Sequence, residues 1–159
     1  MKSLVPQILY TEDHADTREL VSFVLTACNC KVTLADTDGK ALLLARANQF
    51  DLYLIDNWIA GGSGIELCKK LREFDPSTPI LFYSGAAYDS DKQEAFASGA
   101  QGYLTKPVDN DDLVEAVFHL ISKAKSAFEG KENIVASQRR STVDKTAENT
   151  RRNCRPRNR

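Results

Sequence analysis

The chain has 159 residues, 42% of them apolar, which is enough for one proper hydrophobic core. No apolar run approaches the roughly 18 residues that cross a bilayer, and the N-terminus lacks a secretory signal, so we expect a cytoplasmic protein with no membrane partner. The charge is uneven: residues 1–128 carry 12 Lys/Arg and 18 Asp/Glu, whereas residues 129–159 carry 9 and 4. An acidic body is thus followed by a basic tail.

Strand-like apolar runs alternate with segments of helical periodicity along residues 7–128. The predicted strands are Gln7–Tyr10, Lys31–Ala35, Leu52–Ile55, Ile80–Tyr83 and Gly102–Leu104. The predicted helices are Asp16–Ala27, Gly39–Gln49, Gly64–Phe74, Ser90–Ser98 and Asp111–Phe128. Five such units predict an α/β fold, a flavodoxin-like doubly wound parallel sheet with strand order 2-1-3-4-5 and helices on both faces.

Capping signals support these boundaries, and the composition changes after them. Ser63-Gly64-Ile65-Glu66 and Ser90-Asp91-Lys92-Gln93 read as capping boxes, and Gly99 stands where a C-terminal glycine is expected. Residues 129–159 contain no aromatic and few aliphatic residues, so we predict a disordered basic tail. This tail is too short and too polar for a dedicated DNA-binding domain.

Polar side chains follow four of the five strands. They are Glu12 and Asp13, Asp56, Ser84, and Lys106, with Tyr103 just before the lysine. Because parallel sheets bind ligands outside the carboxyl ends of their strands, we expect these groups to converge. Each position alone has a simpler interpretation as a helix cap or a turn. All of them in this order favour a shared site.

The convergent groups suit phosphoryl transfer to a carboxylate. Three neighbouring carboxylates need a cation, and oxygen ligands favour Mg²⁺. Lys106 and Ser84 would bind phosphoryl oxygens, and Asp56 would be the nucleophile that forms an aspartyl phosphate.

From Gln7 to about Lys125 the chain resembles the receiver domain of two-component response regulators. The matching motifs are Ile8–Asp13, Asp51–Asp56 with Gly64 eight residues on, Ser84-Gly85 and Lys106-Pro107. The resemblance implies that residues 1–128 form a receiver domain. It implies that Asp56 is the phosphoacceptor, that Asp13 binds Mg²⁺ directly, and that Glu12 binds it through water. The backbone carbonyl of Trp58 would be a further ligand.

The resemblance also implies a conformational switch. Ser84 and Lys106 would hold the phosphoryl group, and Tyr103 would be the switch aromatic that turns when Ser84 moves. It further implies a cis Lys106–Pro107 bond and an output surface made of the fourth helix, the fifth strand and the fifth helix.

The expected function is a phosphorylation-controlled switch of a two-component system or phosphorelay. A sensor histidine kinase or a histidine phosphotransfer protein would donate the phosphoryl group, and a downstream protein would read the result. Such a domain promotes only its own phosphorylation and dephosphorylation, so it is not an enzyme with substrate turnover. The cognate kinase, the target, the acyl-phosphate lifetime and homodimerisation on activation stay open.

The sequence departs from the family pattern at two places. Glu12 stands where aspartate is commoner, which a water-mediated role tolerates. Ile59-Ala60 replaces the usual Met-Pro, and we expect the following loop, residues 60–64, to be more flexible than usual. A disabled site would leave a non-phosphorylated, receiver-like binding module.

Other interpretations concern the tail and the chemistry. The basic tail could bind nucleic acid non-specifically, although it has no aromatics for base stacking, or it could lie on the acidic body. A phosphatase of the haloacid-dehalogenase type also uses an aspartate at a strand end. It would require a second aspartate two residues on, where this chain has Trp58.

Overall fold

The structure, a computed structural model, describes residues 4–152, with side chains described as far as residue 132. Five parallel strands form one sheet in the order β2-β1-β3-β6-β7. They are β1 (Gln7–Thr11), β2 (Lys31–Ala35), β3 (Leu52–Ile55), β6 (Ile80–Ser84) and β7 (Gly102–Thr105). Counted along the chain, the five strands of this sheet have the order 2-1-3-4-5, so the predicted flavodoxin-like fold is confirmed.

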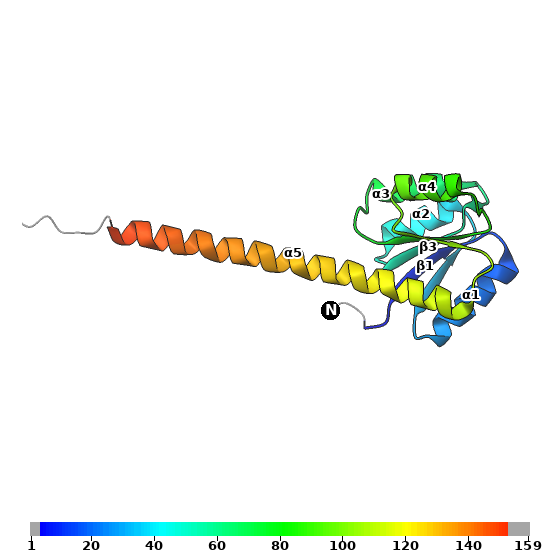
Figure 1. Ribbon diagram of the computed structural model, residues 1–159, viewed down its shortest axis with the longest axis horizontal. Helices are drawn as coiled ribbons and strands as arrows, with labels where there is room; N and C mark the ends of the chain where they lie inside the picture. The colour runs from blue at the N-terminus through cyan, green and yellow to red at the C-terminus, as the bar shows by residue number, and fades with distance from the viewer. Residues whose placement is uncertain (1–3, 153–159) are drawn as a thin grey trace, which may run out of the picture. The chain divides into compact units, whose positions relative to one another are not determined.

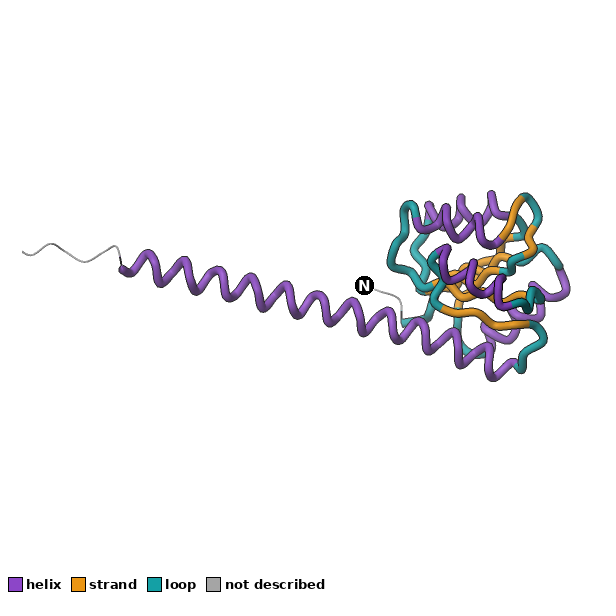
Figure 2. Tube along the Cα trace, turned by 45° about the horizontal axis from the view of Figure 1, so that its top comes forward, coloured by secondary structure: helices purple, strands orange, loops and turns teal. Residues whose placement is uncertain are grey.

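Helices cover both faces of the sheet (Figures 1 and 2). They are α1 (Ala15–Ala27), α2 (Asp38–Ala47), α3 (Gly64–Arg72), α4 (Asp89–Ser98) and α5 (Asn110–Arg152). The first turns of α5 pack with α1 on one face, and α2, α3 and α4 pack on the other.

Each strand divides its side chains between the two faces with a period of two residues. On β1, Leu9 belongs to the core under α2, α3 and α4. Ile8 and Tyr10 belong to the core under α1 and α5. Because both faces are covered, the strands read as nearly continuous apolar runs, as is typical of parallel sheets.

The helix caps agree with the sequence at two of three positions. Ser63 caps α3 and accepts a hydrogen bond from the backbone N–H of Glu66 (3.2 Å). Gly99 ends α4 with a φ of 112°, which favours glycine. The predicted box starting at Ser90 is wrong, because α4 begins at Asp89 and the carboxylate of Asp91 accepts from the backbone N–H of Tyr88 (3.1 Å).

The C-terminal segment differs from its prediction. We expected the last helix to end at Phe128 and a disordered tail to follow, whereas α5 continues to Arg152. A polar segment that cannot build a core can still extend an existing helix, because elongation needs no new nucleus and straight-chain residues favour it. The compact unit that holds the sheet ends at Ala124, and the domain boundary at residue 128 stays a prediction. Within residues 4–152 we find no helix with the length and apolarity to span a bilayer.

Candidate functional site

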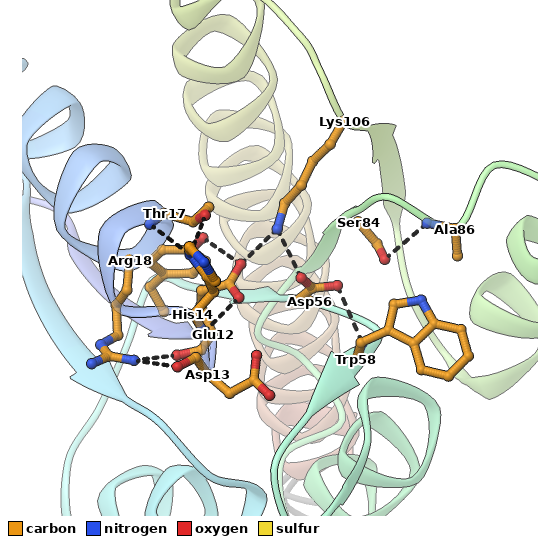
Figure 3. Close-up of polar contacts among 11 residues, drawn as sticks. Glu12, Asp13, His14, Thr17, Arg18, Asp56, Trp58, Ser84, Ala86 and Lys106 are labelled. Carbon is orange, nitrogen blue, oxygen red and sulfur yellow. Dashed lines mark hydrogen bonds and ion pairs between the residues drawn. The ribbon is translucent and has the colours of Figure 1, made fainter.

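The sheet register places the predicted polar residues at one edge. Thr11 pairs with Ile55, and Ser84 pairs with Thr105. The residues that follow these strand ends, Glu12, Asp56 and Lys106, are therefore neighbours at the carboxyl edge of the sheet, where Figure 3 shows their side chains pointing toward one another. This convergence agrees with the expectation from parallel-strand topology.

Lys106 bridges two buried carboxylates. Its Nζ atom lies 2.6 Å from Oε2 of Glu12 and 2.7 Å from Oδ2 of Asp56. Glu12 is 1% exposed and Asp56 is 6% exposed. The same Nζ atom lies 5.0 Å from the centre of the Tyr83 ring. Buried carboxylates so close together require this shared cation, since their charges are otherwise uncompensated.

The three charges shift one another's protonation. Burial alone would raise the pKa of Asp56, but hydrogen bonds from Lys106 and Ser84 outweigh it, so this pKa is lowered. Burial raises the pKa of Glu12, although the hydrogen bond from Lys106 offsets part of the rise. Burial would lower the pKa of Lys106, but the hydrogen bonds to both carboxylates raise it. Asp56 and Lys106 are consequently both charged at neutral pH.

Further contacts hold Glu12 that the sequence did not predict. The hydroxyl of Tyr10 donates to Oε2 (3.2 Å), and the backbone N–H of His14 donates to Oε1 (3.0 Å). Burial, followed by the charge of Glu12, raises the pKa of Tyr10, so its phenol stays protonated and acts as a donor. The sequence signal for this contact is the spacing of Tyr10 and Glu12, because residues two apart in extended backbone point to the same face.

Arg18 fixes the backbone of the acid pair. Its Nη1 atom donates to the carbonyl of Glu12 (2.7 Å) and to that of Asp13 (3.2 Å), as Figure 3 shows. Arg18 lies on the first turn of α1, the helix that His14 caps by accepting from the backbone N–H of Thr17. No sequence motif predicts this contact of Arg18.

Asp13 differs from the other two acids of the site. It is exposed, and within the described part of the chain its carboxylate makes no hydrogen bond or ion pair. Its oxygens are therefore available to a ligand from solvent.

The segment after Asp56 forms a β-hairpin, and the flexibility expected for residues 60–64 stays a prediction. β4 (Trp58–Ile59) pairs with β5 (Gly62–Ser63), and Ala60 forms a parallel bridge with Thr37. A hydrogen bond from Asp38 N–H to the Ala60 carbonyl (3.3 Å) joins the hairpin to α2. Backbone pairing, which the change from Met-Pro to Ile59-Ala60 does not prevent, forms this hairpin.

The hairpin sets the orientation of Trp58. Its backbone N–H donates to Oδ1 of Asp56 (3.2 Å). Gly64 N–H donates to the carbonyl of Asn57 (2.9 Å), and hydrogen-bonded pairs alternate with non-bonded ones in an antiparallel ladder. Trp58 and Ser63 thus form a non-bonded pair, and the ladder leaves the Trp58 carbonyl unused. Trp58 is 68% exposed, so its side chain does not cover Asp56.

The donors at this edge fit Mg²⁺. Among the described residues, no three His, Cys, Asp or Glu side chains already gather in metal-binding geometry, because Lys106 is bound to two of the three carboxylates. The donor set is nonetheless all oxygen: an unpaired carboxylate on Asp13, the carboxylates of Asp56 and Glu12, and the free carbonyl of Trp58. A hard, oxygen-preferring divalent cation suits this set.

Ser84 and Tyr103 both contact the backbone of Ala86. The hydroxyl oxygen of Ser84 accepts from the backbone N–H of Ala86 (3.3 Å), and the hydroxyl of Tyr103 donates to the carbonyl of Ala86 (2.6 Å). The Tyr103 ring also stacks on Phe82, with 5.8 Å between centroids. The loop after β6 therefore links the two residues. The Lys106–Pro107 bond is cis, as expected.

Comparisons with known proteins agree with this geometry. A family model described as the response regulator receiver domain matches residues 8–118. Over 115 residues the chain is 35% identical to the sensor histidine kinase AruS of Pseudomonas aeruginosa, a match that covers 70% of this chain and 12% of the kinase. Over 119 residues it is 28% identical to the cell cycle transcriptional regulator CtrA of Caulobacter vibrioides, covering 75% and 52% of the two chains.

A solved structure gives the same result. The receiver domain of the Francisella response regulator 1452 superposes with a TM-score of 0.71 at 29% identity, covering 74% of this chain and 98% of that one. The chain therefore belongs to the response regulator receiver domain family of two-component signalling. This family consists of signalling switches rather than classical enzymes. The match spans about half or less of the two curated relatives, 52% of CtrA and 12% of AruS.

Proposed function

We propose that this protein is a phosphorylation-controlled switch that accepts a phosphoryl group on Asp56. The observation that carries the proposal is the ion-pair bridge at the edge of the sheet, in which Nζ of Lys106 contacts both Asp56 (2.7 Å) and Glu12 (2.6 Å). A buried, ionised aspartate beside a fixed cation is the arrangement that a carboxylate nucleophile needs for phosphoryl transfer.

The transfer step uses groups that are already in place. A carboxylate oxygen of Asp56 attacks phosphorus and forms the acyl-phosphate bond, while the bond from phosphorus to the donor breaks and the leaving group keeps the electron pair. The lowered pKa of Asp56 keeps the nucleophile ionised. Lys106 then exchanges a carboxylate contact for a phosphoryl oxygen, and Ser84 donates a hydrogen bond to another.

Mg²⁺ would be held by Asp13, Asp56 and the Trp58 carbonyl, with Glu12 binding through water. When bound, the ion neutralises charge on the phosphoryl oxygens and orients them for in-line attack. Arg18 and the backbone of His14 keep the acid pair in position for this ligand set.

The conformational response would pass through Ala86, whose N–H and carbonyl contact Ser84 and Tyr103 respectively. When the Ser84 hydroxyl turns toward the phosphoryl group, its bond with Ala86 N–H is lost, and the carbonyl that holds Tyr103 moves with it. The side chain of Tyr103, on β7, would then change its position. The surface formed by α4, β7 and α5 would carry the signal to a downstream protein.

The donor would be a phosphohistidine on a sensor kinase or on a histidine phosphotransfer protein. The similarity to a sensor histidine kinase and to a transcriptional regulator supports a place in such a pathway. A diffusible switch or a relay intermediate are the two forms that this function would take.

Incubation with acetyl phosphate and Mg²⁺ tests the proposal. We expect a gain of one phosphoryl group, seen by intact mass and by phosphate-affinity gel, and we expect D56N or an excess of EDTA to abolish it. D51N is the matched control, because Asp51 lies at the other end of β3 and its carboxylate accepts the backbone N–H of Gln7 (2.9 Å), away from the site. Equal labelling of D56N and wild type would reject Asp56 as the acceptor. A folded wild type that gains nothing would point instead to a binding module.

A further inference from the structure

We infer that Tyr10 is a positioning residue for the metal-binding acid Glu12, and that the tyrosine and the glutamate function as a matched pair. This inference rests on the proposed function, because the role of Glu12 toward Mg²⁺ belongs to that proposal. What is added is a residue below the site, on the strand itself, that sets where the carboxylate lies.

Geometry carries the inference. Tyr10 is fully buried, with its ring in the apolar core between the sheet and helices α1 and α5. Its hydroxyl donates to Oε2 of Glu12 at 3.2 Å, the same oxygen that lies 2.6 Å from Nζ of Lys106. Oε1 accepts from the backbone N–H of His14 at 3.0 Å. Both carboxylate oxygens are therefore held, Oε2 by Tyr10 and Lys106 and Oε1 by the backbone of His14.

The length of the side chain at position 12 explains why the pair is matched. The Tyr10 ring is anchored in a packed core and cannot follow a shorter partner. Aspartate would withdraw the carboxylate by about 1.5 Å, one carbon–carbon bond. It would not reach both the Tyr10 hydroxyl and Lys106. Glutamate at this position is thus the residue that lets a buried phenol find its hydrogen-bond partner.

A fixed carboxylate favours metal binding through water. Groups beyond the direct ligands orient those ligands, and their loss commonly weakens metal affinity by about 10–100-fold. Without the Tyr10 hydroxyl, Oε2 would be held by Lys106 alone and would lose its partner when that lysine turns to a phosphoryl oxygen, which would leave the carboxylate fixed only through Oε1. Tyr10 instead keeps Glu12 at the metal site when Lys106 leaves it.

Magnesium titration of the full-length protein tests the pair. Trp58 is the single tryptophan of the chain and adjoins the site, so its fluorescence reports binding, with titration calorimetry as the second readout. We expect Y10F to weaken the Mg²⁺ affinity about 10–100-fold, the usual loss when a group that orients a metal ligand is removed. E12D should weaken it similarly, and Y10F/E12D should be no weaker than E12D, since the bond is already lost there.

Tyr53 supplies the matched control. It is a buried tyrosine on the neighbouring strand β3, and its hydroxyl donates to a carboxylate oxygen of Asp75 at 2.8 Å. Y53F thus removes the same kind of bond outside the site. Urea unfolding of Y10F and Y53F should show similar losses of stability, while only Y10F changes the Mg²⁺ affinity. E12D keeps Tyr10 intact and replaces Y10F as the test if that variant does not fold.

The outcomes separate this inference from the proposed function. An affinity of Y10F within twofold of wild type, or effects of Y10F and E12D that multiply in the double variant, would overturn the pairing and leave the phosphoacceptor proposal standing. A wild-type protein that binds no Mg²⁺ would overturn both. Non-additive losses confined to positions 10 and 12 would establish Tyr10 as the residue that positions Glu12.

Discussion

Replacing Lys106 with methionine is expected to lower the free energy of unfolding by about 2–4 kcal/mol at pH 7 without Mg²⁺, because removal of one partner leaves buried charges uncompensated. Methionine keeps the apolar stem of the side chain and removes only the ammonium group. Glu12 and Asp56, each less than 10% exposed, would then face one another without a cation. Urea unfolding in EDTA measures the loss.

The loss should depend on pH in a defined direction. In the wild type, the pKa of Lys106 is raised, so its contribution is complete at pH 7 and is lost only as the pH rises through the folded-state pKa. The lowered pKa of Asp56 contributes stability above the unfolded-state value, and that contribution is lost as the pH falls through the folded-state pKa.

The stability of K106M should respond to a falling pH in the opposite direction from that of the wild type. Without Lys106, burial raises the pKa of both Glu12 and Asp56 above their unfolded-state values. Protonation then relieves the repulsion, so the stability of K106M improves relative to wild type as the pH falls from 7 to about 5. A difference between the two proteins that stays constant over this range would contradict the assignment of the effect to these carboxylates.

Lys70 provides the control for this substitution. Its Nζ atom lies 3.6 Å from Oδ2 of Asp38, and 45% of the lysine side chain is exposed. Exposed ion pairs contribute about 0–1 kcal/mol. K70M should therefore change the unfolding free energy little and without a comparable pH dependence. Similar losses of unfolding free energy in K70M and K106M would show that the contacts of Lys106 with Glu12 and Asp56 stabilise the fold no more than an exposed ion pair does.

The fold could be predicted because both faces of the sheet are covered. Strands buried on both sides must be short apolar runs, and the intervening helices show one apolar stripe each. The strand ends also determine where the polar residues converge, so Glu12, Asp56 and Lys106 could be placed at one edge from the sequence. Ser84 and Tyr103 could be placed beside them by the same rule.

What the sequence did not show depends on contacts within and between elements. The Tyr10 and Arg18 hydrogen bonds depend on rotamers and on how α1 sits against β1. The β4–β5 hairpin depends on backbone pairing, which glycines at positions 61 and 62 permit but do not signal. The length of α5 could not be predicted from composition. The low apolar content after residue 128 excludes a packed core, but a helix can continue without a core of its own.

Replacing Gly64 with alanine should disrupt the proposed phosphoacceptor, Asp56, directly. A Cβ atom at this position would overlap the backbone carbonyl of Asp56, and would lie 2.9 Å from Cα of Asn57 and 2.9 Å from the ring of Phe82. Two of these neighbours are backbone atoms, and the third is a fully buried side chain. None of them can move aside without a cost in free energy. Overpacking of this kind typically costs about 1–3 kcal/mol.

The cost should appear in function as well as in stability. To admit the methyl group, the chain must move either the start of α3 or the peptide of Asp56 itself. Oδ1 of Asp56 accepts from the N–H of Trp58 (3.2 Å), the first residue of the hairpin, so a shift there would misalign the carboxylate proposed as the nucleophile. We expect G64A to lose most of its labelling by acetyl phosphate even at temperatures where circular dichroism shows it folded.

Gly39 makes the comparison specific. It lies in α2, and a Cβ atom there would meet no atom within 4 Å. G39A should be neutral or stabilising by up to about 1 kcal/mol, since alanine favours helix, and it should label normally. If G64A labels as well as G39A, the carboxyl edge can accommodate the extra carbon and the close packing around Asp56 is not required. If only G64A fails to label, Gly64 is required for the close packing against the Asp56 backbone rather than for the conformation of a turn.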